Sequence, residues 1–423
     1  MSNPLLSLSS ARVAGEPIGV YSICSAHPWV IEAAISQAID DGGSLVIEAT
    51  SNQVNHAGGY TGMTPAEFKA FVFKIADRLG FDKERLVLGG DHLGPNPWRH
   101  LNAAEAMDHA KETVRQYVAA GFSKIHLDTS MACAGEVEPL DEAVIAARAA
   151  ELCAVAEQGN ANPAPLYIIG TEVPPPGGAQ HELQAIELTS PEAARRAIEV
   201  HRQAFLDKGL EQAWSRVIAL VVQPGLEFGD TRVIDYVPEK SRDLCRLLQE
   251  EPKLVFEAHS TDYQSQQTYT ELVRDGFAIL KVGPALTFAM REALAALEDI
   301  ERQLVPAERH SQLFATIESV MLHSPKNWQS HYHGSEHTKQ LLRMYSYSDR
   351  MRYYWHEPPV SDAVARLMTN LQAIEIPEVM LSRYLPEQYE AIRSGTLSPD
   401  PQSLIQHKIR QVIRRYAHAC NVQ

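Results

Sequence analysis

Eight short β-rich runs recur along the chain, and each is followed by a segment with helical periodicity. The runs are GVYSICSAH (19–27), SLVIEAT (44–50), RLVLGGDH (85–92), KIHLDTS (124–130), LYIIGTEV (166–173), RVIALVVQ (216–223), KLVFEAHS (253–260) and AILKVG (278–283). This alternation indicates βαβ units, which build a parallel sheet. Eight units are the number that closes a (β/α)8 TIM barrel, and we therefore predict this α/β fold.

Capping residues support the helices between the runs. A Pro, Thr, Asn or Ser at the start of a segment favours the first helical turn, and Gly favours its end. The pairs of start and stop are Pro28 with Gly42, Thr64 with Gly80, Asn102 with Gly121, and Ser190 with Gly209. Start and stop signals therefore agree at four separate helices.

The last third of the chain has a different pattern. From about residue 290 the β-rich runs cease, and amphipathic helical segments follow, among them 291–304, 312–322, 360–374 and 403–419. We predict a barrel over residues 1–290 and a helical extension over 291–423 that packs on it. The Arg- and Tyr-rich stretch 343–356 and the basic end 407–419 are compatible with packing on their own domain or on a neighbouring subunit.

Charge and cysteine content exclude several classes of protein. The chain has 38 Lys and Arg against 53 Asp and Glu, a formal charge of −15, which disfavours nucleic acid and anionic membranes as partners. Its five cysteines contain no CxxC pair, and the N-terminus lacks a signal-peptide pattern. No GxxxxGK[ST] or GxGxxG motif follows a strand, so we expect no nucleotide cofactor. We expect a cytoplasmic protein.

Strand periodicity separates the side chains that face the helices from those that face the barrel lumen. By this criterion Glu48, His126, Asp128, Glu257, His259 and Lys281 point inward, and further polar residues stand at strand ends: His27, Asp91, His92, Glu172 and Gln223. Barrel enzymes place their active sites at these carboxyl ends. Any single polar residue here could serve only as the hydrogen-bond partner of a buried neighbour. Polar residues at the ends of nearly all eight strands favour a catalytic site instead.

Two mechanisms suit this set of residues and a carbonyl or sugar substrate. In the first, imidazole and carboxylate groups hold a divalent metal that polarises a carbonyl while a nearby carboxylate moves a proton. In the second, Lys281 forms a Schiff base. Several candidate ligands against a single candidate lysine favour the metal, and Lys281 then acts as an ion-pair partner or a phosphate contact.

Three glycine-containing segments are compatible either with phosphate binding through backbone N–H groups or with tight turns alone. They are GGYTG (58–62), PPPGG (174–178) and the helix start GPALTF (283–288). The histidines His331, His333 and His337 lie in polar surroundings typical of a solvated loop, and we leave them out of the site.

Whole blocks of strand and loop resemble the Z subunit of bacterial tagatose-1,6-bisphosphate aldolase, the GatZ/KbaZ family. These blocks include ICSAHPWVIEAA, LVIEATSNQVNHAGGYTGMTP, LVLGGDHLGPNPW, GFSKIHLDTSM, IIGTEVPPPGG, VVQPGLEF, FEAHSTDYQ and LKVGPALTFAMREA, with SDRMRYYW and YLPEQYEAIRSG in the extension. The resemblance implies a (β/α)8 barrel that acts in galactitol or N-acetylgalactosamine catabolism with a Y subunit, a class II zinc aldolase. In that family the Z chain supports the activity and stability of the Y chain. Some relatives carry the name tagatose-6-phosphate kinase, and the absence of a nucleotide-binding loop speaks against it.

The resemblance also implies roles for individual residues. Class II aldolases have an Asp-His pair at the end of the third strand, which Asp91 as proton carrier and His92 as zinc ligand match. His259 corresponds to their seventh-strand ligand and Glu172 to their fifth-strand carboxylate. Their sixth-strand His is replaced here by Gln223, which suits a weaker metal site or a different reaction.

These considerations give one assignment of the site and two principal functions. The chain is expected to be the Z component of the aldolase complex or, alternatively, a metal-dependent C4-epimerase that converts tagatose 6-phosphate to fructose 6-phosphate. A third possibility is a barrel that serves only as a binding scaffold. The metal is expected to be Zn²⁺, with Mn²⁺ as the alternative, and self-association is left open. We assign catalytic roles to Asp91, Asp128 and Glu48, substrate binding to His27, His126, Gln223 and Lys281, and metal binding to His92, Glu172 and His259.

Overall fold

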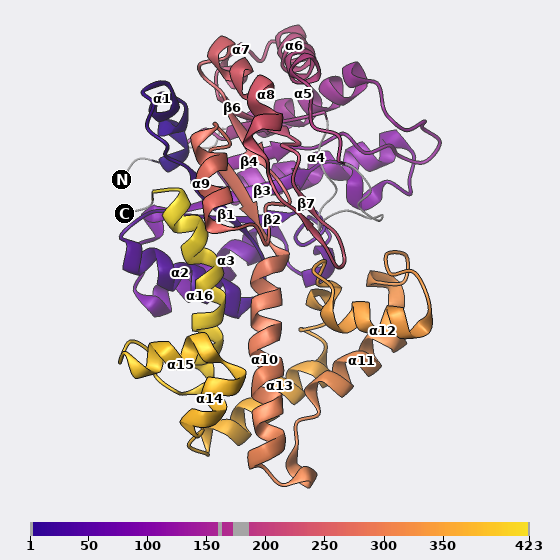
Figure 1. Cartoon of the computed structure of the whole chain (residues 1–423). Coiled ribbons are helices and arrows are strands. Elements are labelled where there is room, and N and C mark those ends of the chain that lie inside the picture. The colour runs from indigo at the N-terminus through magenta and orange to yellow at the C-terminus, as the bar shows by residue number, and fades with distance from the viewer. Residues whose placement is uncertain (1–2, 160–162, 172–185, 422–423) are drawn as a thin grey trace.

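Eight parallel strands close into a barrel in the computed structural model, which describes residues 3–159, 163–171 and 186–421 (Figure 1). Around the barrel the strands follow the order β1-β10-β9-β6-β5-β4-β3-β2. Their bounds are β1 Val20–Cys24, β2 Leu45–Thr50, β3 Leu86–Leu93, β4 Lys124–Leu127, β5 Leu166–Ile169, β6 Val217–Val222, β9 Val255–Ala258 and β10 Ile279–Val282. Each predicted run coincides with one barrel strand, with β3 ending one residue beyond its run, and the predicted fold is confirmed. A short hairpin, β7 (Glu227–Phe228) and β8 (Val233–Ile234), follows β6.

Helices surround the barrel on the outside. They are α2 Pro28–Asp41, α3 Pro65–Leu79, α4 Ala103–Ala119, α5 Glu142–Gln158, α6 Pro191–Asp207, α7 Glu211–Trp214, α8 Pro238–Glu250 and α9 Gln266–Arg274. The predicted caps are confirmed at three of them, because the side chains of Thr64, Asn102 and Ser190 accept N–H hydrogen bonds in the first turns of α3, α4 and α6. Gly42 and Gly80 end α2 and α3 in the left-handed conformation.

The amino-terminal end of the lumen is closed by apolar side chains. Leu5 of the 3-10 helix η1 (Pro4–Ser7) and Leu8 of α1 (Leu8–Val13) cover the amino-terminal end of the barrel. They pack with inward residues of the strands, including Val20, Val46, Val87, Ile168, Val221 and Ile279. We call this apolar layer at the amino-terminal end the floor of the barrel. It closes that end of the lumen, so polar groups meet solvent at the carboxyl end.

The helix that follows the last strand leaves the barrel. α10 (Pro284–Leu304) runs outward into the extension, and α16 (Pro401–Ala419) packs against α2, α9 and α10 in the ring position next to β1 (Figure 1). Its Tyr416 ring lies 4.0 Å from the ring of Tyr269, centroid to centroid, and its hydroxyl lies 3.0 Å from Oγ1 of Thr261. Ile409 and Ile413 are fully buried. The last helix of the chain therefore completes the ring of helices around the barrel.

The remaining extension is helical, as predicted. It comprises η5 Ala307–Arg309, α11 Leu313–His323, η6 Pro325–Asn327, α12 Glu336–Tyr345, η7 Arg350–Tyr353, α13 Pro358–Gln372, α14 Glu378–Tyr384 and α15 Pro386–Arg393. The boundary expected at residue 290 falls within α10, and one apolar core continues from the barrel helices into α11, α13 and α16. Among the residues that the structure describes, no helix has the length and apolar character required to span a bilayer.

We predict that shortening a buried side chain of α16 destabilises the whole barrel. Ile409→Ala should lower the free energy of unfolding by about 2–5 kcal/mol, because it leaves a cavity between the last helix and the barrel. Arg415→Ala, on the exposed face of the same helix, is the matched control. Urea unfolding followed by circular dichroism checks this. An unchanged transition midpoint in Ile409→Ala would contradict a structural role of α16 in the barrel.

Candidate active site

Four charged side chains fill the middle of the lumen, directly above the apolar floor. They are Glu48 on β2, Lys124 on β4, Glu257 on β9 and Lys281 on β10, and each is less than 5% exposed. The Lys124 ammonium lies 2.8 Å from Oε1 of Glu48 and 2.7 Å from Oε2 of Glu257. The Lys281 ammonium lies 2.5 Å from Oε2 of Glu48. We call these four residues the lumen charge layer.

Local backbone makes room for this layer. A Cβ atom on Gly89 of β3 would stand 2.6 Å from Cγ of Glu48, so only glycine leaves the space that the glutamate occupies. The Ser22 hydroxyl donates a further hydrogen bond to Oε1 of Glu48. With two ammonium groups between two carboxylates, the buried charges balance one another.

The state of Lys281 bears on the Schiff-base mechanism. Burial opposes its charge, but Asp91, Glu48 and Glu257 outweigh this effect and raise the pKa of Lys281 well above its usual value. The ammonium also lies 3.0 Å from Oδ1 of Asp91. A Schiff base requires the neutral amine, so this environment favours an ion-pair role for Lys281 over a nucleophilic one.

Three histidines and an aspartate stand immediately above the charge layer. Asp91, His92, His126 and His259 are all buried, and one potential ligand atom from each lies within 4.8 Å of the others. The ring centroids of His92 are 5.1 Å from His126 and 4.9 Å from His259. We call these four residues the histidine cluster. Asp91 and His92 lie on β3, His126 lies on β4, and His259 directly follows β9, so the four residues meet only because the barrel closes.

Carboxylates behind the cluster fix two of the imidazole rings. Nδ1 of His92 lies 2.7 Å from Oδ2 of Asp128, and Nε2 of His259 lies 2.9 Å from Oε1 of Glu257. Each of these rings therefore keeps its other nitrogen for a ligand, which is the arrangement found behind metal-binding histidines. Nε2 of His126 is buried and has no hydrogen-bond partner among the described residues. This unpaired nitrogen is the observation that best fits a bound cation.

Burial and charge set the protonation states of the site. Burial lowers the pKa of His259 to about 4, so the imidazole is neutral at pH 7 and can donate a lone pair. For Asp128, burial raises the pKa, but the hydrogen bond with His92 and its charge lower it to about 2. Three imidazoles with a neighbouring carboxylate form a donor set suited to Zn²⁺, and the residues present thus fit a divalent metal.

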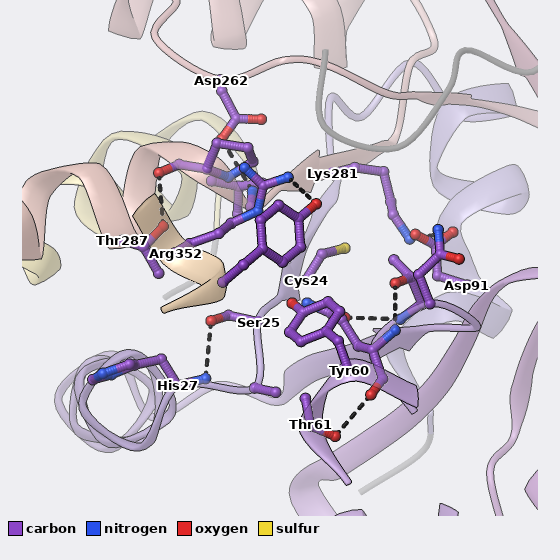
Figure 2. A pocket seen from close by; sticks show the side chains of 18 of the residues that line it. Cys24, Ser25, His27, Tyr60, Thr61, Asp91, Asp262, Lys281, Thr287 and Arg352 are labelled. Carbon is purple, nitrogen blue, oxygen red and sulfur yellow. Dashed lines mark hydrogen bonds and ion pairs between the residues drawn. The ribbon is translucent and has the colours of Figure 1, made fainter. Parts of the chain in front are cut away.

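A cavity of about 340 Å³ opens above the cluster. Its walls come from the barrel strand ends, from the loop after β2 and from the extension. Among the residues that line it are Tyr60, Asp91, His92, His259, Asp262, Lys281, Arg352 and Tyr353. Figure 2 shows Lys281 and Asp91 together on one side of this pocket and Arg352, Asp262 and Thr287 on the other.

The structure places the sequence-predicted residues at different depths. Asp91, His92, His259, Lys281 and His27 line the pocket, and Nδ1 of His27 also accepts the N–H of Trp29 at the start of α2. His126 lies in the histidine cluster. Asp128 lies behind His92, Glu48 belongs to the lumen charge layer, and Glu172 is outside the described residues.

Gln223 has a local role in the structure. Its side-chain oxygen accepts the N–H of Gly225 at 2.9 Å, and its backbone N–H donates to the Thr189 hydroxyl. It is not among the residues that line the described pocket. The geometry therefore gives Gln223 a place in the loop after β6.

Two of the three glycine-containing segments hold their N–H groups in internal hydrogen bonds. Oδ1 of Asp262 accepts the N–H groups of Gly283 and Ala285 at the start of α10. In the loop at 58–62, Tyr60 and Thr61 donate to backbone carbonyls of residues 52 and 53. These contacts favour structured turns over phosphate cradles. The segment 174–178 lies outside the described residues.

Sequence reasoning missed four residues of the site. Lys124 stands two positions before His126 on β4, so the same strand periodicity could have placed it in the lumen. Asp262, Arg352 and Tyr353 line the pocket from a loop and from η7. The Arg- and Tyr-rich stretch 343–356 was the signal for the last two, but the sequence alone does not show which surface it faces.

Comparisons with known proteins agree with this architecture. A family model described as "D-tagatose-1,6-bisphosphate aldolase subunit GatZ/KbaZ-like" matches residues 5–421. The crystal structure of a probable tagatose 6 phosphate kinase from Sinorhizobium meliloti 1021 is 50% identical in sequence, with a TM-score of 0.89. That match covers 95% of this chain and 100% of the other.

A more distant likeness concerns the fold. The native crystal structure of the fructuronate-tagaturonate epimerase UxaE from Cohnella laeviribosi is 10% identical, with a TM-score of 0.52. The match covers 96% of this chain and 81% of the epimerase. At this identity the likeness shows a shared fold.

We predict that removing one cation from the lumen charge layer is strongly destabilising. Lys124→Met leaves Glu48 and Glu257 facing each other without their shared partner, and the free energy of unfolding should fall by about 3–5 kcal/mol. Lys74→Met, on the exposed surface of α3, is the control. Urea unfolding at pH 7 measures both variants. Equal stability of the two variants would refute the balance of charges described here.

We predict that Asp128 supports metal binding through His92. Asp128→Asn removes the carboxylate that fixes the His92 ring, so the affinity for Zn²⁺ should fall about 10–100-fold. Competition with a chromophoric chelator measures this affinity. Asp362→Asn, exposed on α13, should leave it unchanged. Equal affinity in wild type and Asp128→Asn would show that His92 is not a ligand in this orientation.

Proposed function

This chain belongs to the D-tagatose-1,6-bisphosphate aldolase subunit GatZ/KbaZ-like family, and from this premise we propose that its barrel has a metal-dependent active site for a phosphorylated ketohexose. The reaction is C4-epimerisation, the interconversion of tagatose 6-phosphate and fructose 6-phosphate by aldol cleavage and re-addition. The histidine cluster carries this proposal. Potential ligand atoms of its three imidazoles lie within 4.8 Å of one another beside a pocket, and outer carboxylates orient two of the rings.

In the proposed site, different residues bind the metal and orient its ligands. His92, His126 and His259 hold the cation, and when bound it serves as a Lewis acid that polarises the substrate carbonyl. Zn²⁺ suits this donor set best, and Mn²⁺ is the alternative. Asp128 and Glu257 orient His92 and His259 from behind. The fifth-strand residue Glu172 remains a proposed additional ligand.

We assign the proton transfer to Asp91. Of the two candidate carboxylates, Asp91 lines the pocket, whereas Asp128 lies behind His92. The Lys281 ammonium lies 3.0 Å from Oδ1 of Asp91 and stabilises the ionised carboxylate, which can then accept a proton. Lys281 and Glu48 keep this carboxylate in place from below.

The reaction balances without an oxidant or a second substrate. The C4 hydroxyl gives its proton to the base, the C3–C4 bond breaks, and its electron pair passes to an enediolate of carbons 1–3. Carbon 4 becomes the aldehyde carbon of glyceraldehyde 3-phosphate. Rotation of this aldehyde about C4–C5, followed by re-addition and return of the proton, inverts C4.

We place this reaction in the cytoplasm and propose no phosphoryl transfer. The five cysteines are free in the structure, which suits a reducing compartment. The 50% identical relative is called a probable kinase, but the sequence of this chain contains no P-loop motif.

The direct test is the appearance of fructose 6-phosphate when the purified chain is incubated with tagatose 6-phosphate and Zn²⁺ or Mn²⁺. We predict activity that EDTA abolishes and that falls at least 100-fold in His259→Ala, because the variant lacks one ligand. His337→Ala, exposed in the extension, is the control. Activity that survives both EDTA and His259→Ala would exclude the metal mechanism, and borohydride trapping on Lys281 would replace it with a Schiff base.

The family description favours a second candidate function. In this proposal the chain is the Z component of tagatose-1,6-bisphosphate aldolase and stabilises a class II Y subunit in galactitol or N-acetylgalactosamine catabolism. We predict that the two chains co-purify and that Y-subunit activity outlasts heating longer when this chain is present. Absence of both effects would remove this candidate and leave the epimerase proposal untouched.

A further inference from the structure

One arginine of the extension reaches into the barrel pocket. Arg352 belongs to η7, yet it lines the cavity together with residues of β3 and β10 (Figure 2). We propose that Arg352 is the anion-binding residue of this pocket and receives the phosphate group of the substrate. The identity of the anion as a sugar phosphate rests on the proposed function, whereas the site itself rests on the contacts below.

The segment that carries Arg352 is fixed to the barrel. Oδ1 of Asp349 lies 2.8 Å from Nη1 of Arg291, and its Oδ2 accepts the Thr287 hydroxyl at 2.5 Å, both from α10. The Tyr347 N–H donates to the carbonyl of Asp230, which follows β7. These contacts attach η7 to α10 and to the β7–β8 hairpin, and they fix the position of Arg352 at the pocket.

Arg352 has no carboxylate within ion-pair distance among the described residues. Its guanidinium donates to the carbonyls of Ser348 and Asp349 and to the hydroxyl of Tyr353, 2.8 Å away. The nearby Asp349 has both oxygens engaged by Arg291 and Thr287. A guanidinium offers five N–H donors, so the charge and part of the donor set remain for a ligand.

The other cation of the pocket is already neutralised. Arg352 and Lys281 are the Lys and Arg residues that line the described cavity, and Lys281 contacts Glu48 and Asp91. In a chain with a formal charge of −15, Arg352 is thus the group best able to attract an anion into this pocket.

The position of Arg352 suits a substrate that spans the pocket. Figure 2 places it across the cavity from Asp91 and Lys281. The ring of Tyr353 meets that of Tyr60 edge to face, with centroids 4.9 Å apart, and forms an aromatic wall beside it. A ketohexose phosphate can then place its carbonyl end at the histidine cluster and its phosphate at Arg352, where a guanidinium binds phosphate in bidentate fashion.

The test compares binding of tagatose 6-phosphate and of tagatose by titration calorimetry. We expect Arg352→Gln to raise the Kd of tagatose 6-phosphate at least 10-fold and to leave the Kd of tagatose within about 2-fold, because only the phosphate loses its partner. Arg352→Lys keeps the charge and should show a smaller loss. The control Arg366→Gln, exposed on α13, should change neither value. An unchanged Kd for tagatose 6-phosphate in folded Arg352→Gln would overturn the inference.

A second measurement uses the wild-type chain, in case the variants fail to fold. Phenylglyoxal modifies accessible arginines, and peptide mass spectrometry reads the extent at each position. Inorganic phosphate should protect Arg352 and leave Arg366 fully reactive. Equal modification of Arg352 with and without phosphate would contradict the proposal.

These measurements separate the inference from the proposed function. Neither of them requires turnover. Phosphate-dependent binding through Arg352 without epimerase activity would support the anion site and remove the proposed reaction. Epimerase activity with an unchanged Kd for tagatose 6-phosphate in Arg352→Gln would support the proposed reaction and remove the anion site at Arg352.

Discussion

The balance of buried charge in the barrel lumen is the constraint on which the rest of the site depends. Lys124 and Lys281 lie between Glu48 and Glu257, and all four side chains are buried. Leaving any of these four unpaired would cost several kcal/mol, so the strands that carry them must close around one another. The same groups reach upward, since Lys281 contacts Asp91 and Glu257 orients His259. The geometry of the histidine cluster therefore depends on the same contacts that hold the closed barrel together.

The extension participates in both parts of the molecule. α16 takes the place in the helical ring that α10 leaves when it runs out of the barrel, and η7 carries Arg352 and Tyr353 to the pocket. A division at residue 290 cuts through α10 and separates residues that share one apolar core and one cavity. The helices after β10 complete a barrel that would otherwise lack one outer helix and one wall of its pocket.

Much of the fold could be predicted from local sequence signals, because strand periodicity and helix caps act within a few residues. The same periodicity predicted that Glu48, His126, Asp128, His259 and Lys281 face the lumen, where their contacts place them. Other features depend on contacts between distant segments. The role of α16 follows from packing against α2 and α9, and the pocket position of Arg352 follows from the ion pair of Asp349 with Arg291. Lys124 was accessible to the periodicity argument, but a basic residue at the start of a strand resembles a solvated end.

The proposed reaction requires that the histidine cluster hold a metal. Anomalous diffraction at the zinc edge, from crystals grown with one equivalent of Zn²⁺, tests it most directly. We predict a single strong peak bounded by His92, His126 and His259, with Asp91 beside it. No peak at that position, or a peak only at the exposed histidines of the extension, would contradict it.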